Sequence, residues 1–130
     1  MQIVFRVLSL LIAAIFVASA LRWIVDPAAA AASLGMDLLS RTGASTQIGD
    51  IGAFFVCVAA MIGLAQRRGH SHWFLPAAML LGAAAVMRTL AWVTGNADFA
   101  AQMIVSEVIM AMILGTASRL RSNEAGDGAA

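Results

Sequence analysis

The sequence has 130 residues, of which 62% are hydrophobic, and its formal net charge is only +1. Soluble domains contain about 45–50% apolar residues, so this composition, with a mean hydropathy of +0.89, indicates a membrane protein. The near-zero charge argues against nucleic-acid binding, which needs a basic patch or stripe. The single cysteine, Cys57, cannot form an internal disulfide. We interpret Cys57 as a small, buried apolar residue of a membrane helix.

The first apolar stretch covers residues 3–25, which is long enough to span because about 20 residues cross a bilayer. Arg6 near its start can extend its side chain to the lipid head groups. A cleaved signal peptide is the alternative: Arg6 would be its basic start, residues 7–17 its apolar core and residues 18–20 its cleavage site. Because the apolar character continues past that site to Val25, we favour a retained helix.

A short connection is expected between the first and second spans. Asp26-Pro27 ends the first helix, because proline lacks an N–H and disfavours helical geometry in the residue before it. Residues 28–39 are too short and too weakly apolar to span. We predict that they form a short helix at the membrane interface, with a break at Gly35. Residues 40–46 are polar and are predicted to form a loop.

Three further apolar stretches follow, separated by polar residues, glycine and proline. We predict spans at residues 47–65, 76–94 and 99–118. The polar, glycine-containing tail at residues 122–130 is predicted to be disordered. The predicted fold is therefore all-α. It is a four-transmembrane-helix bundle with a short interfacial helix between spans 1 and 2, forming a single membrane domain over residues 1–121.

The arginines predict how this bundle is oriented. With four spans, both termini and the loop between spans 2 and 3 lie on one side of the membrane. Five of the eight arginines belong to that side: Arg6, Arg67, Arg68, Arg119 and Arg121. The positive-inside rule therefore predicts a multi-pass protein with both termini in the cytoplasm.

Four charged residues lie inside the predicted spans, one on each span: Arg22, Asp50, Arg88 and Glu107. Because a helix rises about 1.5 Å per residue, Arg88 and Glu107 lie roughly 9 and 12 Å below the outer membrane boundary, and Arg22 and Asp50 roughly 5 Å below it. An isolated charge near mid-bilayer costs at least about 2.5–3.5 kcal/mol. We therefore predict an inner pair, Arg88–Glu107, capped by an outer pair, Arg22–Asp50. Trp92 shares the helix face of Arg88.

This charged cluster has two interpretations, and the sequence leaves both open. Its ion pairs either fix which helices meet, or they bind a ligand in a cavity open to the outer leaflet, since an ionisable residue in a span marks a functional site by default. The candidate ligand-binding residues are Arg22, Asp50, Arg88, Trp92 and Glu107. His70 and His72 form an H-x-H motif, but two histidines without a third ligand do not predict a metal site. No cofactor is predicted.

The chain resembles the DUF4345 family of small bacterial four-helix membrane proteins, whose function is unknown. The resemblance rests on the Asp26-Pro27 helix end, the Leu34-Gly35 segment, the glycine-containing start of span 2 at residues 47–52, Arg88 late in span 3 and Glu107 in span 4. It covers nearly the whole chain, although Asp50 stands where the family often has a basic residue. The resemblance implies the four-span architecture and a location in the bacterial inner membrane. It implies no activity.

Two classes of function fit these observations. The first is a non-enzymatic membrane module that binds a lipid-like or other amphipathic small molecule, or acts as an accessory subunit of a membrane complex. Arg88 would contact the polar end of the ligand, and Glu107 would hold Arg88. The alternative is a small membrane-embedded isomerase or hydrolase acting on an apolar substrate, with Glu107 as the acid or base. The expected partners are membrane lipids, a hydrophobic small molecule, and another membrane protein or a second copy of the chain, without nucleic acid.

Overall fold

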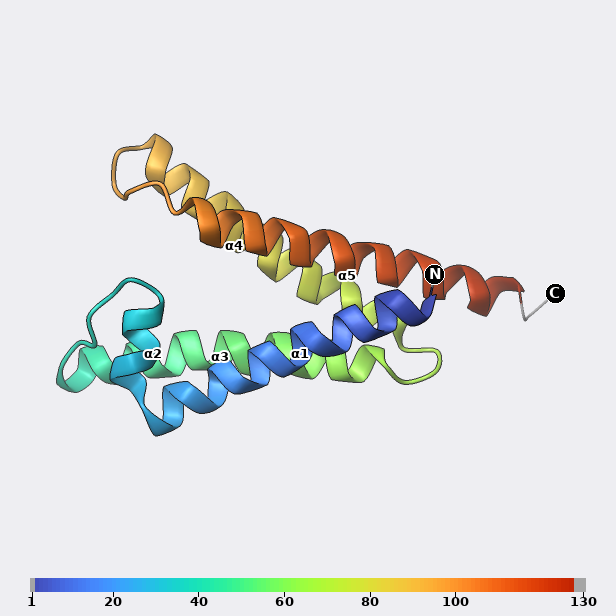
Figure 1. Ribbon diagram of the computed structural model, residues 1–130, viewed down its shortest axis with the longest axis horizontal. Helices are drawn as coiled ribbons and strands as arrows, with labels where there is room; N and C mark the ends of the chain where they lie inside the picture. The colour runs from blue at the N-terminus through green and yellow to red at the C-terminus, as the bar shows by residue number, and fades with distance from the viewer. Residues whose placement is uncertain (1, 128–130) are drawn as a thin grey trace. The chain divides into compact units, whose positions relative to one another are not determined.

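The computed structural model describes residues 2–127, and their side chains as far as Arg121. The described chain is helical and contains no strand, which confirms the predicted all-α class (Figure 1). Its elements, in chain order, are α1 (Gln2–Val25), α2 (Pro27–Ser33), α3 (Arg41–Ala65), the 3₁₀ helix η1 (Ser71–Trp73), α4 (Phe74–Val93) and α5 (Ala101–Asp127).

Four helical segments are long and apolar enough to cross a membrane: Gln2–Val25, Arg41–Ala65, Ser71–Val93 and Ala101–Arg121. Many of their large apolar side chains are exposed, including Ile3 and Ile24 on α1 and Met79 on α4. In water this exposure would be unfavourable, whereas in a bilayer these side chains meet lipid tails of similar polarity. The chain is therefore a multi-pass membrane protein with four helical spans.

Two expectations about these elements were wrong. Residues 40–46 are not a loop, because α3 already begins at Arg41; Thr46 donates its hydroxyl to the Thr42 carbonyl, so this polar turn is accommodated within the helix. α5 runs as far as Asp127 in the described chain, and the disorder of the tail at residues 122–130 stays a prediction. Residues 128–130 of that tail lie outside the described residues. Cys57 is exposed rather than buried.

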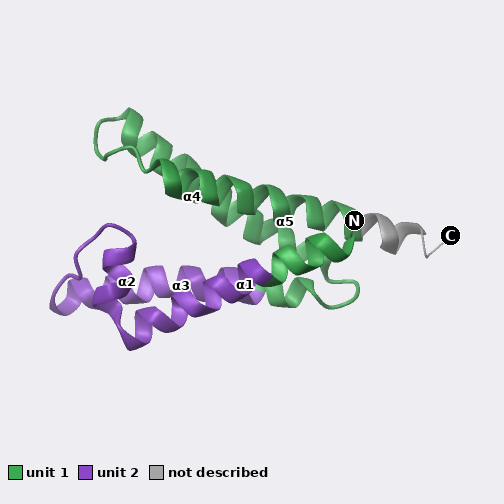
Figure 2. Ribbon diagram, viewed as in Figure 1, with its two compact units in different colours: residues 1–10, 61–130 green, residues 11–60 purple. Residues whose placement is uncertain are grey.

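The chain forms two compact units (Figure 2). Unit 2 comprises residues 11–60, and its interior is apolar. Trp23 of α1 is buried against Ala30 and Ala31 of α2, and apolar side chains of the linker and of α3 pack around them. Further along the same two long helices, the ring of Phe16 lies 5.3 Å from that of Phe55, measured between centroids. Aromatic and alanine packing therefore holds α1, α2 and α3 together in this unit.

The linker of unit 2 is fixed by local hydrogen bonds. Asp26 caps α2, because its carboxylate accepts the Ala29 N–H at 3.0 Å. The helix ends at Ser33, and Gly35 follows it with a φ of 74°, which suits a residue without a side chain; this confirms the predicted break at Gly35. Gln47 of α3 then holds the following segment: its side chain accepts the Leu39 N–H and donates to the Asp37 carbonyl.

Unit 1 comprises residues 1–10 and 61–130, and its largest part is the α4–α5 hairpin. The two helices run antiparallel and pack along their length (Figure 1). The turn between them begins at Gly95, which has a φ of 73°. Gly95 donates to the Trp92 carbonyl and Asn96 to the Ala91 carbonyl, the two hydrogen bonds of a Schellman motif. α4 thus ends at Val93, within one residue of the predicted end of the third span at residue 94, and α5 returns beside α4.

A polar network, which we call the Gln66 network, closes the other end of unit 1. It consists of Ser9, Gln66 and Arg121. Gln66 donates its side-chain amide to the fully buried Ser9 hydroxyl at 3.0 Å. Arg121 of α5 donates to the Ala65 carbonyl at 2.9 Å and to the Gln66 carbonyl at 3.3 Å, capping the end of α3. The guanidinium of Arg121 also lies 5.9 Å from the centre of the Phe74 ring. The network thus joins the start of α1, the end of α3 and the end of α5.

Candidate ligand site at Arg88 and Glu107

The antiparallel hairpin brings the two most deeply placed charges of the sequence into contact. Arg88 of α4 donates from Nε to Oε1 of Glu107 on α5, at 2.9 Å. Matched depths on two helices joined by a short turn predicted this pair, and the structure confirms it. The contact is charge-assisted, and it neutralises two groups that would each be costly alone in an apolar environment.

The two partners of this ion pair are unequally buried. The side chain of Glu107 is 10% exposed, and that of Arg88 is 37% exposed. Glu107 Oε2 is buried and has no hydrogen-bond partner among the described residues. A buried acceptor without a donor costs about 1–3 kcal/mol, and more when it is charged. The pair therefore retains an acceptor on Glu107 and unused guanidinium donors on Arg88, because only Nε of Arg88 is hydrogen-bonded within the described chain.

A small cavity of about 280 Å³ lies beside Arg88, near the α4–α5 turn. We call it the Arg88 niche. Its charged lining residues are Arg88 and Asp98, and its other lining residues are Met87, Ala91, Ala97 and Ala100. The niche therefore offers one cation and one carboxylate within apolar walls. A polar group that both accepts and donates hydrogen bonds matches this lining better than a simple anion, which Asp98 would repel.

Trp92 lies one helical turn after Arg88 but does not line the niche. Its ring packs against that of Phe99, with the centroids 4.7 Å apart, and its side chain is about half exposed. Trp92 and Phe99 therefore brace the turn that carries Asp98. A direct role for Trp92 in ligand binding stays a prediction.

The predicted outer pair, Arg22–Asp50, does not form. Both residues belong to unit 2 and both are exposed, and within the described chain neither has an ion-pair partner. Their neighbours explain the difference: Trp23 and Ile51 face the apolar core of this unit. Because each step along a helix turns the side chain by about 100°, Arg22 and Asp50 cannot face that core as well. Their participation in a site with Arg88 and Glu107 stays a prediction.

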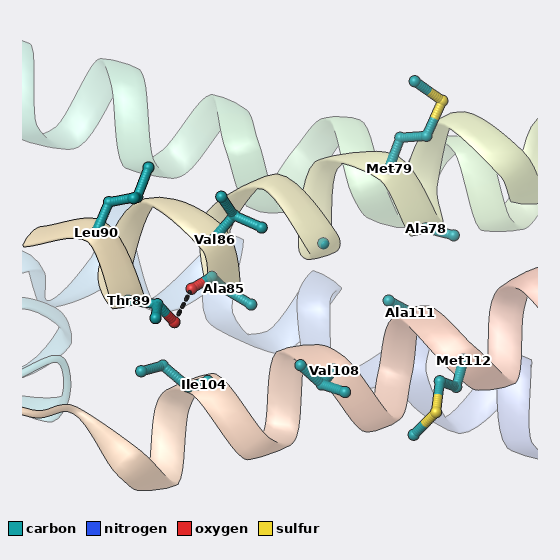
Figure 3. Close-up of a pocket in the computed structure, with 11 residues that line it drawn as sticks. Ala78, Met79, Ala85, Val86, Thr89, Leu90, Ile104, Val108, Ala111 and Met112 are labelled. Carbon is teal, nitrogen blue, oxygen red and sulfur yellow. Dashed lines mark hydrogen bonds between the residues drawn. The ribbon is translucent and has the colours of Figure 1, made fainter. Parts of the chain in front are cut away.

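A second and larger cavity, about 610 Å³, runs between α4 and α5. We call it the α4–α5 groove; Figure 3 shows its lining. Thr89 and Ala85 point towards α5, whereas Val86 and Leu90 point away from it (Figure 3). The Thr89 hydroxyl donates to the Ala85 carbonyl at 2.8 Å, so the groove keeps no free hydroxyl donor. This groove can accept hydrocarbon but offers nothing that orients a polar group.

Two sets of polar residues were not predicted from the sequence. One is Asp98, whose place beside Arg88 depends on how the Gly95 motif folds the chain back. The Gln66 network was missed as well, although a serine inside the first apolar stretch and a glutamine at the end of the second gave a signal.

His70 and His72 stack, with ring centroids 5.9 Å apart. Among the described residues no group of three histidine, cysteine or acidic side chains could hold a metal ion.

Comparison of the chain with models of known protein families, with curated proteins and with solved structures finds no match. The fold and the site define the class: a small all-α membrane protein with four spans, in whose α4–α5 hairpin Arg88 pairs with Glu107. Membership of the DUF4345 family stays a prediction from the sequence.

Proposed function

We propose that this protein binds a lipid-like amphipathic small molecule whose polar end accepts hydrogen bonds from Arg88. The observation that carries the proposal is the one-point contact of Arg88 with Glu107. A guanidinium has five N–H donors in a fork that suits two-point recognition of oxygen acceptors. An arginine that served only to neutralise Glu107 would be expected to use both arms of that fork. Arg88 instead lines a cavity with donors to spare.

Glu107 acts in this proposal as the positioning residue of Arg88. Its carboxylate fixes Nε and so restricts the rotamers of the long side chain, which lowers the entropy lost when a ligand binds. Asp98 contributes selectivity, because a carboxylate in the same niche favours a polar end that also donates a hydrogen bond, such as a hydroxyl or protonated amine. The apolar part of the molecule would remain in contact with the membrane-facing surface of the hairpin.

The proposal is tested by native mass spectrometry of the full chain extracted in a gentle detergent, followed by chemical identification of the molecules that leave it. Wild-type protein should carry a small amphipathic molecule, and Arg88→Gln should lose it. Asp98→Asn leaves the ion pair intact and should change which molecule is carried. Arg41→Gln is the matched control, because it removes an exposed arginine of α3 that is not part of the niche.

Bare wild-type protein would contradict this proposal. A protein adduct without a small molecule would instead favour the accessory-subunit interpretation. Thermal unfolding of each variant, followed by circular dichroism in the same detergent, distinguishes loss of the ligand from loss of the fold.

The unpartnered Oε2 of Glu107 favours a second candidate, a small membrane isomerase or hydrolase in which Glu107 donates or accepts a proton. Arg88 would then stabilise negative charge on the substrate. Exchanging the two residues, Arg88→Glu with Glu107→Arg, distinguishes the two candidates from an architectural pair. A swapped protein that both folds and supports the wild-type phenotype would exclude catalysis by Glu107.

We further infer that the protein resides in a bacterial inner membrane with both termini in the cytoplasm. The support is the excess of arginine at the ends of the spans that share a side with the N-terminus. Labelling of single cysteines placed at His72 and Ala97, in a Cys57→Ala background, tests this orientation. A membrane-impermeant thiol reagent should label Ala97→Cys and not His72→Cys when it is applied from outside.

A further inference from the structure

We propose that the basic end of unit 1 is a binding site for the phosphodiester head group of an anionic lipid. The site, which we call the basic end, consists of Arg6, Arg67, Arg68 and Arg119. It lies at the end of the α4–α5 hairpin opposite the Arg88 niche, so the proposal does not rest on the proposed function.

The Gln66 network places these arginines at one end of the unit. Arg6 precedes Ser9 by one helical turn, Arg67 and Arg68 directly follow Gln66, and Arg119 lies two residues before Arg121. Because Gln66 bonds to Ser9, and Arg121 to the Ala65 and Gln66 carbonyls, the three segments that carry the four arginines meet. Residues far apart in the sequence therefore place four arginines at one end of the unit.

These four arginines are exposed and have no acidic partner within the described chain. Arg121 differs from them, because its guanidinium donates hydrogen bonds to two backbone carbonyls and lies over the Phe74 ring. The sequence explains the absence of acidic partners: it has no aspartate or glutamate in residues 1–25 or 51–97. Glu124 and Asp127 follow Arg121 in the sequence, and their side chains lie outside the described residues. The four arginines of the basic end outnumber the two acidic residues that follow Arg121, which leaves an excess of positive charge for an anion from outside the chain.

The position of the basic end identifies that anion as part of a lipid. Arg67 and Arg68 follow directly on the end of α3 at Ala65, and Arg119 lies in the last turns of the fourth span, Ala101–Arg121. At span ends such as these, arginine side chains extend into the head-group layer. Trp73, whose ring packs against His72 at 5.7 Å between centroids, follows in the same loop, and tryptophan prefers this layer. Anionic head groups are the fixed negative charges present at that depth, and they attract clustered arginines.

The loop that carries Arg67 and Arg68 is held in shape. His70 Nδ1 lies 2.9 Å from the Arg68 carbonyl, which can only accept, so Nδ1 donates. Gly69 between them has a φ of 76°, which glycine adopts without strain. The loop therefore presents its two arginines from a closed turn, which lowers the entropic cost of holding a phosphodiester.

Lipid retention in native mass spectrometry tests the proposal. The full chain is mixed in detergent with equal amounts of phosphatidylglycerol and phosphatidylcholine, and the adducts are counted as collision energy rises. Wild type should retain phosphatidylglycerol preferentially. Arg67→Gln with Arg68→Gln should lower that retention on the order of tenfold, whereas Arg67→Lys with Arg68→Lys should keep most of it. Arg41→Gln, compared with Arg68→Gln alone, controls for the loss of one exposed charge.

Four results would overturn the proposal: equal retention of the two lipids by wild type, unchanged retention by the double glutamine variant, displacement of the lipid by inorganic phosphate at matched ionic strength, or an acidic protein adduct in place of the lipid. Circular dichroism melts establish that the variants are folded. A glutamine variant that does not fold is replaced by the single variant Arg68→Gln, which should lose several-fold in retention.

Discussion

The two units of this protein hold their helices together by different means. In unit 2, Trp23, two alanines and a group of phenylalanines fill the interior, and the charged residues Arg22 and Asp50 point away from it. In unit 1, the ion pair of Arg88 with Glu107 and the Gln66 network supply specific polar bonds between segments. Lipid gives little hydrophobic driving force for helix association, so close packing and polar bonds are the two means available. This chain uses close apolar packing in unit 2 and polar bonds in unit 1.

The largest effect is expected from emptying the apolar core of unit 2. Trp23→Ala removes a side chain that is 2% exposed and leaves a cavity among alanines. Buried tryptophan-to-alanine changes cost about 3–5 kcal/mol. The free energy of unfolding, measured in mixed detergent micelles by circular dichroism, should fall by about that amount. Trp92→Ala is the matched control because Trp92 is about half exposed, and its cost should be clearly smaller. Equal losses for the two variants would contradict the assignment of Trp23 to the core.

The next largest effect is expected from breaking the ion pair of unit 1. Arg88→Leu leaves the Glu107 carboxylate buried and unpaired, and this should cost about 3 kcal/mol. The double variant Arg88→Leu with Glu107→Leu removes both charges. It should recover most of that loss, because two apolar side chains of similar volume leave no buried charge without a partner. A double-mutant cycle in the same micelles measures the coupling free energy directly.

Arg22→Leu and Asp50→Leu provide the comparison for this cycle. Both residues are exposed and unpaired within the described chain, so each change should alter stability by less than about 0.5 kcal/mol, and the cycle between them should show no coupling. Strong coupling between Arg22 and Asp50 would restore the outer pair that the sequence predicted.

The smallest effect is expected from a single member of the Gln66 network. Gln66→Leu removes the bond to Ser9 and the long, 3.5 Å bond that Gln66 Oε1 accepts from Arg121, but it leaves Arg121 bonded to the Ala65 and Gln66 carbonyls. Hydrogen bonds between membrane helices contribute about 0.6 kcal/mol on average and less than about 2 kcal/mol in most cases. Unfolding in micelles should therefore shift by about 1 kcal/mol. Gln102→Leu on α5, where the glutamine is exposed, should have no measurable cost.

Local signals made much of this fold predictable. Pro27 after Asp26, Gly35 and Gly95 each require a particular backbone geometry, and the structure ends helices at all three places. The Arg88–Glu107 pair was predictable because a short turn fixes the relative depth of two adjacent helices. In each case the sequence determines a local property: the backbone geometry of a few consecutive residues, or the relative depth of two helices joined by a short turn.

The side-chain contacts between the other helices could not be predicted from the sequence, because they depend on how each helix is rotated about its axis. The matched depths of Arg22 and Asp50 predicted that these two residues pair, yet the burial of Trp23 and Ile51 turns both of them outward. The polar start of α3 was taken for a loop because its bonds, such as that from Thr46 to Thr42, run back along the helix itself. The position of Asp98 beside Arg88 likewise depends on the path of residues 96–98 after Gly95, which the sequence pattern leaves open.

The Gln66 network also sets an order for the biosynthesis of this chain. Unit 2 is one uninterrupted stretch, whereas unit 1 joins residues 1–10 to residues 61–130. The ribosome thus delivers all of unit 2 before it has made the helices that the first turns of α1 contact. Ser9 gains its partner once Gln66 has been synthesised, and the carbonyls that end α3 gain theirs only with Arg121. Arg121 therefore completes a unit whose first segment, residues 1–10, was synthesised before all of unit 2.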